Sequence, residues 1–185
     1  MVKSGIESVN GELQNMFWYC FGMERADIIL RASEQPDKND YDEFCEVLEK
    51  RCCGAPLQYA IGEWEFMGLR LSVGEGVLIP REDTTVVVNS ALQVLRGVGN
   101  PRIIDLCSGS GCIALAIEKN LNSRGEIYAL ELSEKAFEYL QTNCTRNGSK
   151  TKPINGDVMS CNKDFENSFF DLIISNPPYI ESEAI

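Results

Sequence analysis

Four residues near the end of the sequence, Asn176-Pro177-Pro178-Tyr179, follow an apolar run and have the chemistry to hold a planar amino group. Pro177 keeps Asn176 extended, because a proline excludes the helical region for the residue before it. Pro178 fixes its own φ at about −65°. The turn can therefore present Oδ1 of Asn176 and a main-chain carbonyl as two rigid acceptors, while Tyr179 supplies a ring face. We predict that Asn176, Pro177 and Tyr179 are catalytic and that all four residues bind a substrate NH2 group; a strand-ending turn with a capping Asn is the alternative.

A second motif is the glycine-rich turn Cys107-Ser108-Gly109-Ser110-Gly111, which lies between an apolar stretch and a helical pattern. Gly109 and Gly111 have no Cβ, so the backbone can turn sharply and approach a ligand closely. In α/β folds such a turn faces a nucleotide-type ligand, and an acidic residue about 20 positions later binds the ribose. Glu131 stands at that distance. We predict that residues 107–111 and Glu131 contact a cofactor; a structural turn without a ligand is the alternative.

Two cofactors fit this turn, NAD through the pattern GxGxxG/A and S-adenosylmethionine at the same strand end. Asp157 ends a third apolar stretch and could hold an adenine amino group. The chain contains no histidine, so no side chain titrates near neutrality without a large pKa shift. An activated sulfonium needs no acid, whereas a hydride-transferring enzyme would need His or a Tyr-x-x-x-Lys pair. We therefore expect S-adenosylmethionine.

The composition excludes several classes of protein. The formal net charge is −11, and Lys and Arg are scattered, so we do not expect duplex nucleic acid as a partner. No apolar run reaches the roughly 18 residues that span a bilayer, and the polar stretch after Met1 does not resemble a signal peptide. The eight cysteines form no CxxC pair, and no histidine completes a zinc site. We predict buried free thiols, no metal site and a cytoplasmic location.

The periodicity of apolar residues divides the chain into a helical part and an α/β part. Residues 11–31 are helical with a break at Gly22, Asp40 is the expected N-cap of the next helix, and residues 63–80 read as a hairpin. A further helix covers residues 84–96. Apolar strands at residues 102–106, 126–131, 152–155 and 171–175 then alternate with helices at 113–120 and 134–147. Such alternation indicates a parallel sheet buried on both faces.

The segments DLCSGSGCIALAI and SNPPYI together resemble the amino-group methyltransferases of the Rossmann-like class. The stretch GAPLQYAIGEWEFMGLRLSVGEGVLIPREDT resembles the linker of one family, the HemK/PrmC peptide chain release factor N5-glutamine methyltransferases. Residues 5–53 are similar to that family's small helical domain. The resemblance implies an α/β fold with a Rossmann-like sheet. It also implies a helical substrate-binding domain at 1–60, a hairpin linker at 61–80 and a methyltransferase domain at 81–185.

The resemblance also implies a reaction and assigns residues to it. The family's (N/D)PPY turn grips the glutamine amide of the GGQ motif in a release factor, which places that glutamine at residues 176–179. Residues 107–111, Glu131, Asp157, Val158 and Asn176 would line the S-adenosylmethionine site. Arg81 and Asp83 lie in the family's IPR-x-(D/E)-T segment, near the cleft.

The sequence departs from the family pattern in three ways. Cys107 stands where the family usually has glycine, Glu82 replaces a proline, and the chain stops before the remaining sheet strands. We therefore expect a truncated methyltransferase domain. Two substrates other than the release factor share the chemistry: the amino groups of nucleic-acid bases, and a ribosomal-protein glutamine. An inactive cofactor-binding fragment is the alternative of a different class.

Overall fold

The computed structural model describes residues 1, 6, 8–161, 165 and 168–178. The chain divides into two compact units, Met1–Gly62 and Glu63–Ile185. Within the described residues, no helix is both long and apolar enough to cross a membrane.

The first unit consists of helices α1 (Val9–Phe21), α2 (Arg25–Leu30), α3 (Lys38–Cys52) and α4 (Leu57–Ile61). Helix α1 ends at Gly22, which takes the left-handed conformation with φ 63°, as the predicted break requires. The expected N-cap of α3 is wrong. That helix begins three residues earlier, because the Asp37 carboxylate accepts the Asn39 N–H at 2.8 Å and caps the first turn.

Two kinds of contact join α1 to α3. The Arg51 guanidinium donates to both carboxylate oxygens of Glu12, at 2.6 and 3.0 Å, and both side chains are mostly buried. The rings of Phe17, Phe21 and Phe44 pack together with centroids 5.1–5.5 Å apart. A bidentate, mostly buried ion pair and an aromatic cluster together give this small unit a core of its own.

The second unit begins with an antiparallel hairpin of β1 (Glu63–Phe66) and β2 (Leu69–Ser72). Its two-residue loop, Met67-Gly68, has φ values of 49° and 73°. Positive φ at both positions marks the type I′ turn, whose twist matches that of the strands. Helix α5 (Thr84–Val94) follows, with Asp83 as its N-cap residue.

The rest of this unit is a four-stranded parallel sheet with connecting helices. Strand β3 (Arg102–Leu106) leads to α6 (Cys112–Asn120), and β4 (Glu126–Glu131) leads to α7 (Glu134–Arg146). Strands β5 (Lys152–Asn155) and β6 (Leu172–Ser175) complete the sheet in the order β5-β4-β3-β6. The predicted α/β class with a helical N-terminal domain is confirmed.

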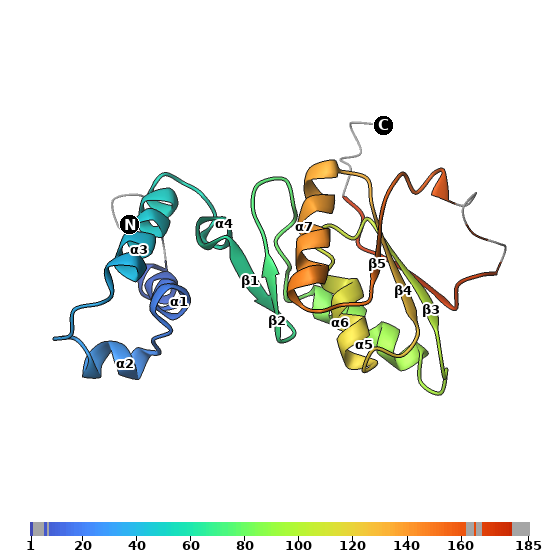
Figure 1. Cartoon of the computed structure of the whole chain (residues 1–185), viewed down its shortest axis with the longest axis horizontal. Coiled ribbons are helices and arrows are strands. Elements are labelled where there is room, and N and C mark those ends of the chain that lie inside the picture. Colours follow the sequence, from blue (N-terminus) through green and yellow to red (C-terminus); the bar gives the residue numbers. More distant parts are fainter. Residues whose placement is uncertain (2–5, 7, 162–164, 166–167, 179–185) are drawn as a thin grey trace. The chain divides into compact units, whose positions relative to one another are not determined.

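The two faces of the sheet are covered differently. Helices α5, α6 and α7 lie on one side of the strands (Figure 1), where Ile103, Ala114 and Leu140 are fully buried. The opposite face carries a cluster of aromatic rings, namely Tyr128, Phe165, Phe169 and Phe170. No helix covers this face among the described residues, and Ile173 is 63% exposed. The predicted burial of both faces holds at the two central strands, where Ile104 and Leu130 on the aromatic face are 2% and 1% exposed. It fails at β6, where Ile173 is exposed.

The strand order reverses between β3 and β6. Chain order runs outward from β3 through β4 to β5, and β6 then pairs with the other side of β3. In open α/β sheets, ligands bind outside the carboxyl ends of the strands at such a switch point.

Candidate functional site

The predicted site residues follow strands that share one edge of the sheet. All four strands are parallel, so their carboxyl ends lie side by side. Leu106 pairs with Ser175 in the register, so Cys107 and Asn176 leave adjacent strand ends on the two sides of the switch point. Leu106 also pairs with Leu130, which brings the end of β4 and Glu131 to the other side of the glycine turn.

Backbone and carboxylate hydrogen bonds fix the glycine turn against β4. The Ser108 N–H donates to the Leu130 carbonyl at 3.0 Å, and the Gly111 N–H closes the turn onto the Ser108 carbonyl at 2.8 Å. Oε2 of Glu131 accepts the Gly109 N–H at 2.8 Å, while Oε1 accepts the Ser133 N–H at 2.9 Å. Each carboxylate oxygen keeps a second lone pair, so Glu131 can still accept a ribose hydroxyl.

The two glycines of the turn have different surroundings. Both have positive φ, 55° at Gly109 and 81° at Gly111. A Cβ added to Gly111 would lie 2.5 Å from Cδ1 of Leu140, so this glycine is required by packing. A Cβ added to Gly109 would meet only Val77, at 3.9 Å. The space beside Gly109 is therefore open to a ligand that approaches the backbone.

Asp105 lies at the candidate site, and the sequence analysis gave it no role. Its side chain is fully buried, and Oδ2 accepts the Ala114 N–H at 3.3 Å, which caps α6 in place of the side chain that Gly111 lacks. Oδ1 has no partner among the described residues, and neither does the buried Oγ of Ser108. Burial raises the pKa of Asp105 to about 8; the hydrogen bond from Ala114 opposes this shift and the Glu131 charge adds to it. The available signal was a lone acidic residue at the end of the apolar strand RIIDL.

Cys107 takes a backbone conformation that favours glycine. Its φ is 58°, where the Cβ of an L-residue crowds the following carbonyl. Burial raises the pKa of its thiol, the Glu131 charge adds to the rise, and a hydrogen bond with Ser175 opposes it. The thiol therefore stays protonated and does not act as a nucleophile.

Asp157 and Val158 follow β5 at the same edge. The Asp157 carboxylate is exposed, and its Oδ1 accepts the Met159 N–H at 2.9 Å in a local turn. Val158 is half-buried. Leu132, directly after Glu131, is 64% exposed and Met159 is 86% exposed. Apolar side chains therefore lie beside the ends of β4 and β5, where a flat base would need them, and the sequence analysis did not assign either.

The Asn-Pro-Pro turn begins directly after β6. Because Ser175 pairs with Leu106, this turn starts next to the glycine turn that follows β3. Asn176 is half-buried, and Pro177 and Pro178 are exposed. Ser175 Oγ donates to the Leu106 carbonyl at 2.8 Å, which extends the pairing of β6 with β3 up to the turn. Tyr179, predicted to supply the ring face, lies outside the described residues.

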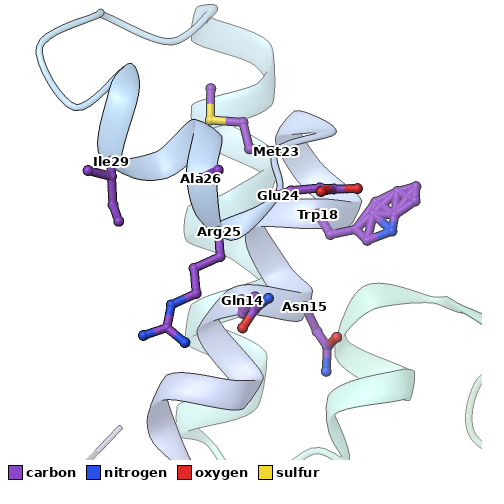
Figure 2. A pocket seen from close by; sticks show the side chains of 8 residues that line it. All are labelled: Gln14, Asn15, Trp18, Met23, Glu24, Arg25, Ala26 and Ile29. Atoms are coloured by element: carbon purple, nitrogen blue, oxygen red, sulfur yellow. The ribbon is translucent and has the colours of Figure 1, made fainter.

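A separate hollow of about 620 Å³ lies within the helical unit. Figure 2 shows Trp18 of α1, Arg25 and Ile29 of α2 among its lining side chains. Trp18 is 51% exposed and Ile29 is 73% exposed. Exposed aromatic and aliphatic side chains around a hollow are typical of a surface that binds another protein.

Two family models match the chain. The PrmC N-terminal domain matches residues 2–62, and the methyltransferase small domain matches residues 84–185. The chain belongs to the HemK/PrmC family.

Curated relatives of this HemK/PrmC chain have the name release factor glutamine methyltransferase. The Fusobacterium nucleatum protein is 38% identical over 83% of the chain and 42% of its own length. The Thermodesulfovibrio yellowstonii protein is 41% identical over 75% of the chain and 50% of its own length. The Streptomyces coelicolor protein is 34% identical over 97% of the chain and 62% of its own length. The chain therefore spans about two fifths to three fifths of the length of these relatives.

Solved structures share the fold of the second unit. One is the 16S rRNA N2 G1207 methyltransferase of T. thermophilus in complex with AdoMet and guanosine. It has a TM-score of 0.52 and 20% identity, over 65% of this chain and 33% of that one. A SAM-dependent methyltransferase from Agrobacterium tumefaciens has a TM-score of 0.51 and 18% identity, over 63% of this chain and 40% of that one. At these identities the likeness shows the fold alone.

Proposed function

We propose that this chain is an S-adenosylmethionine-dependent methyltransferase that acts on N5 of the glutamine amide in the GGQ motif of a peptide chain release factor. The observation that carries the proposal is the register at the switch point, where Leu106 pairs with Ser175. It brings the ends of the glycine turn and of the Asn-Pro-Pro turn together, which a transfer between two bound groups requires. The names of the curated relatives support the choice of substrate.

The strand-end residues fit S-adenosylmethionine. The open space beside Gly109 admits the methionine part close to the backbone. The unpartnered buried atoms, Oδ1 of Asp105 and Oγ of Ser108, are two free hydrogen-bonding groups for the polar end of the methionine part. The free lone pairs of Glu131 suit two ribose hydroxyls, and Asp157 and Val158 lie where the adenine would follow.

The chain's part in the reaction is to hold the amide. When bound, S-adenosylmethionine supplies a methyl group that is already activated by its sulfonium. Oδ1 of Asn176 and the Pro177 carbonyl accept the two amide N–H bonds, which points the nitrogen lone pair at that methyl. Positioning of this kind can lower the barrier by about 7–11 kcal/mol at best. The proton on nitrogen leaves to water, so the absence of histidine from the sequence is no obstacle.

The helical unit would dock the release factor. Its match to the PrmC N-terminal domain and its exposed Trp18 support this role. Trp18→Ala should raise the KM for the release factor at least about tenfold, because exposed tryptophans often dominate interfaces, and should leave cofactor affinity unchanged. Tyr41 is the matched control, because it is similarly exposed, at 53%, but does not line the hollow. Equal KM values in the two variants would remove the docking role. Release factors act in the cytoplasm, where we place the protein.

The function is tested by incubating the chain with labelled S-adenosylmethionine and a release factor. Label should enter the release factor, and a release factor with alanine in place of the glutamine should take none. Asn176→Ala should abolish transfer while cofactor affinity stays within about tenfold, or 1.4 kcal/mol. Label in duplex DNA but not in the release factor would contradict the proposed substrate. Transfer by Asn176→Ala would contradict the role of the turn.

A further inference from the structure

One face of α7 follows the second half of the hairpin and the segment after it. The side chains on this face are Lys135, Tyr139, Asn143 and Asn147, each four positions from the next. Asn147 donates to the Arg70 carbonyl at 3.1 Å, and Lys135 pairs with Glu75 at 3.6 Å. Tyr139 lies against Gly74, where an added Cβ would be 2.1 Å from its hydroxyl oxygen. Four helical residues rise about 6 Å and two extended residues about 6.7 Å, so Asn147, Asn143 and Tyr139 stay in step with Arg70, Ser72 and Gly74. The chain turns at Glu75, where Lys135 makes the last contact.

Asn143 is the fully buried member of this face. Its Oδ1 accepts the Ser72 N–H at 2.6 Å, and its Nδ2 donates to the Ser72 carbonyl at 3.1 Å. The side-chain amide thus pairs with Ser72 as a neighbouring strand would. The second hydrogen of Nδ2 goes to the Ser110 carbonyl in the glycine turn, at 2.9 Å. Only an amide side chain offers an acceptor and two donors in this space.

The same hairpin segment reaches the glycine turn at a second point. Val77 follows the hairpin segment in the chain and is buried. It is the side chain that a Cβ on Gly109 would meet first. The turn therefore has the Glu131 bond on one side and the hairpin, through Asn143 and Val77, on the other.

We infer that Asn143 is a positioning residue for the cofactor turn and couples that turn to the hairpin. Its three hydrogen bonds hold the Ser110 carbonyl and Ser72 in fixed relation, so a ligand that orders the turn also stabilises β2. Glu63 of the same hairpin directly follows the helical unit in the chain. Ordering of the cofactor turn thereby stabilises the hairpin, and the hairpin is the segment that follows the helical unit in the chain. The inference deepens the proposed function, because it assumes that the turn binds S-adenosylmethionine.

The coupling is measurable by hydrogen exchange on the 185-residue chain, with S-adenosylhomocysteine as the probe. In the wild type, saturating probe should slow exchange at the Gly109 and Gly111 amides. It should also slow exchange at the Ser72 amide, about fivefold or more, although Ser72 does not touch the proposed site. Protection of the turn without protection of Ser72 would overturn the inference and leave the proposed cofactor in place. The absence of any response, with no binding by calorimetry, would overturn both.

Two variants on the same face separate positioning from general stability. Asn143→Ser should raise the Kd for the probe about five- to tenfold, the equivalent of one lost hydrogen bond. It should also abolish the response of the hairpin while the turn still responds. Asn147→Ser, which loses a bond to the hairpin but none to the turn, should keep the wild-type Kd. A folded Asn143→Ser protein whose Kd and hairpin response match the wild type would refute the assignment.

Discussion

Replacement of Cys107 by glycine should give a more stable protein than its replacement by alanine. Cys107 has φ 58°, and the left-handed region costs an L-residue about 1–2 kcal/mol. Glycine avoids that strain but loses more backbone entropy on folding, which offsets about 0.5–1 kcal/mol. The difference is a net gain of about 0.5–1 kcal/mol for Cys107→Gly relative to Cys107→Ala, because alanine keeps the strained Cβ and removes the thiol.

The comparison with alanine isolates the backbone effect. Thermal unfolding should show a midpoint about 1–4 °C higher for Cys107→Gly than for Cys107→Ala, from the usual scaling for domains of this size. Urea unfolding at neutral pH should give the same order of stability with equal m-values. If Cys107→Gly is no more stable than Cys107→Ala, the left-handed conformation is not a source of strain here, and the explanation is refuted.

Other substitutions in the turn and in β3 have expected outcomes of different kinds. Gly111→Ala should cost about 2–4 kcal/mol in unfolding experiments, since its Cβ would lie 2.5 Å from Leu140 at φ 81°. Gly109→Ala should cost only about 1–2 kcal/mol of left-handed strain yet weaken S-adenosylmethionine binding, as calorimetry can show; a larger loss of stability at Gly109 would reverse our reading of the pair. The folded state of the wild type binds more protons than the unfolded state between the ordinary Asp pKa of about 3.9 and the raised pKa of Asp105, about 8. Its stability therefore falls with rising pH in that window, and Asp105→Asn should remove this fall in urea titrations at pH 5, 6.5 and 8. Parallel pH profiles for the two proteins would contradict the burial of a titrating carboxyl.

The strands and the glycine turn could be predicted because their signals are local. The span of β4 matches the stretch EIYALE, and Ser133 caps α7 as expected, with its side chain accepting the Ala136 N–H at 3.3 Å. Parallel strands then bring their carboxyl ends together by topology alone, so Glu131 and Asn176 could be assigned to one edge before any coordinates.

The residues that were missed act through contacts distant in sequence. Asn143 lies in the middle of a helix and meets residues 71 and 33 positions away, a pairing that no periodicity reveals. Asp105 could be seen as an acidic residue in an apolar strand, but its role as the cap of α6 depends on how that helix packs over β3. The N-cap at Asp37 was misplaced because two aspartates compete within one turn, and the sequence does not show which carboxylate meets a free N–H.

The step-by-step match between α7 and the hairpin has a consequence for how relatives can vary in length. Inserting or deleting a single residue within the segment 70–74 would move the residues on one side of the change by half a strand repeat, so that Arg70, Ser72 and Gly74 could no longer all meet their partners on α7. The Met67-Gly68 loop carries no such restriction, because it lies outside the matched region. Natural insertions in this part of the family should therefore gather at the hairpin loop, and the segment along α7 should keep a constant length.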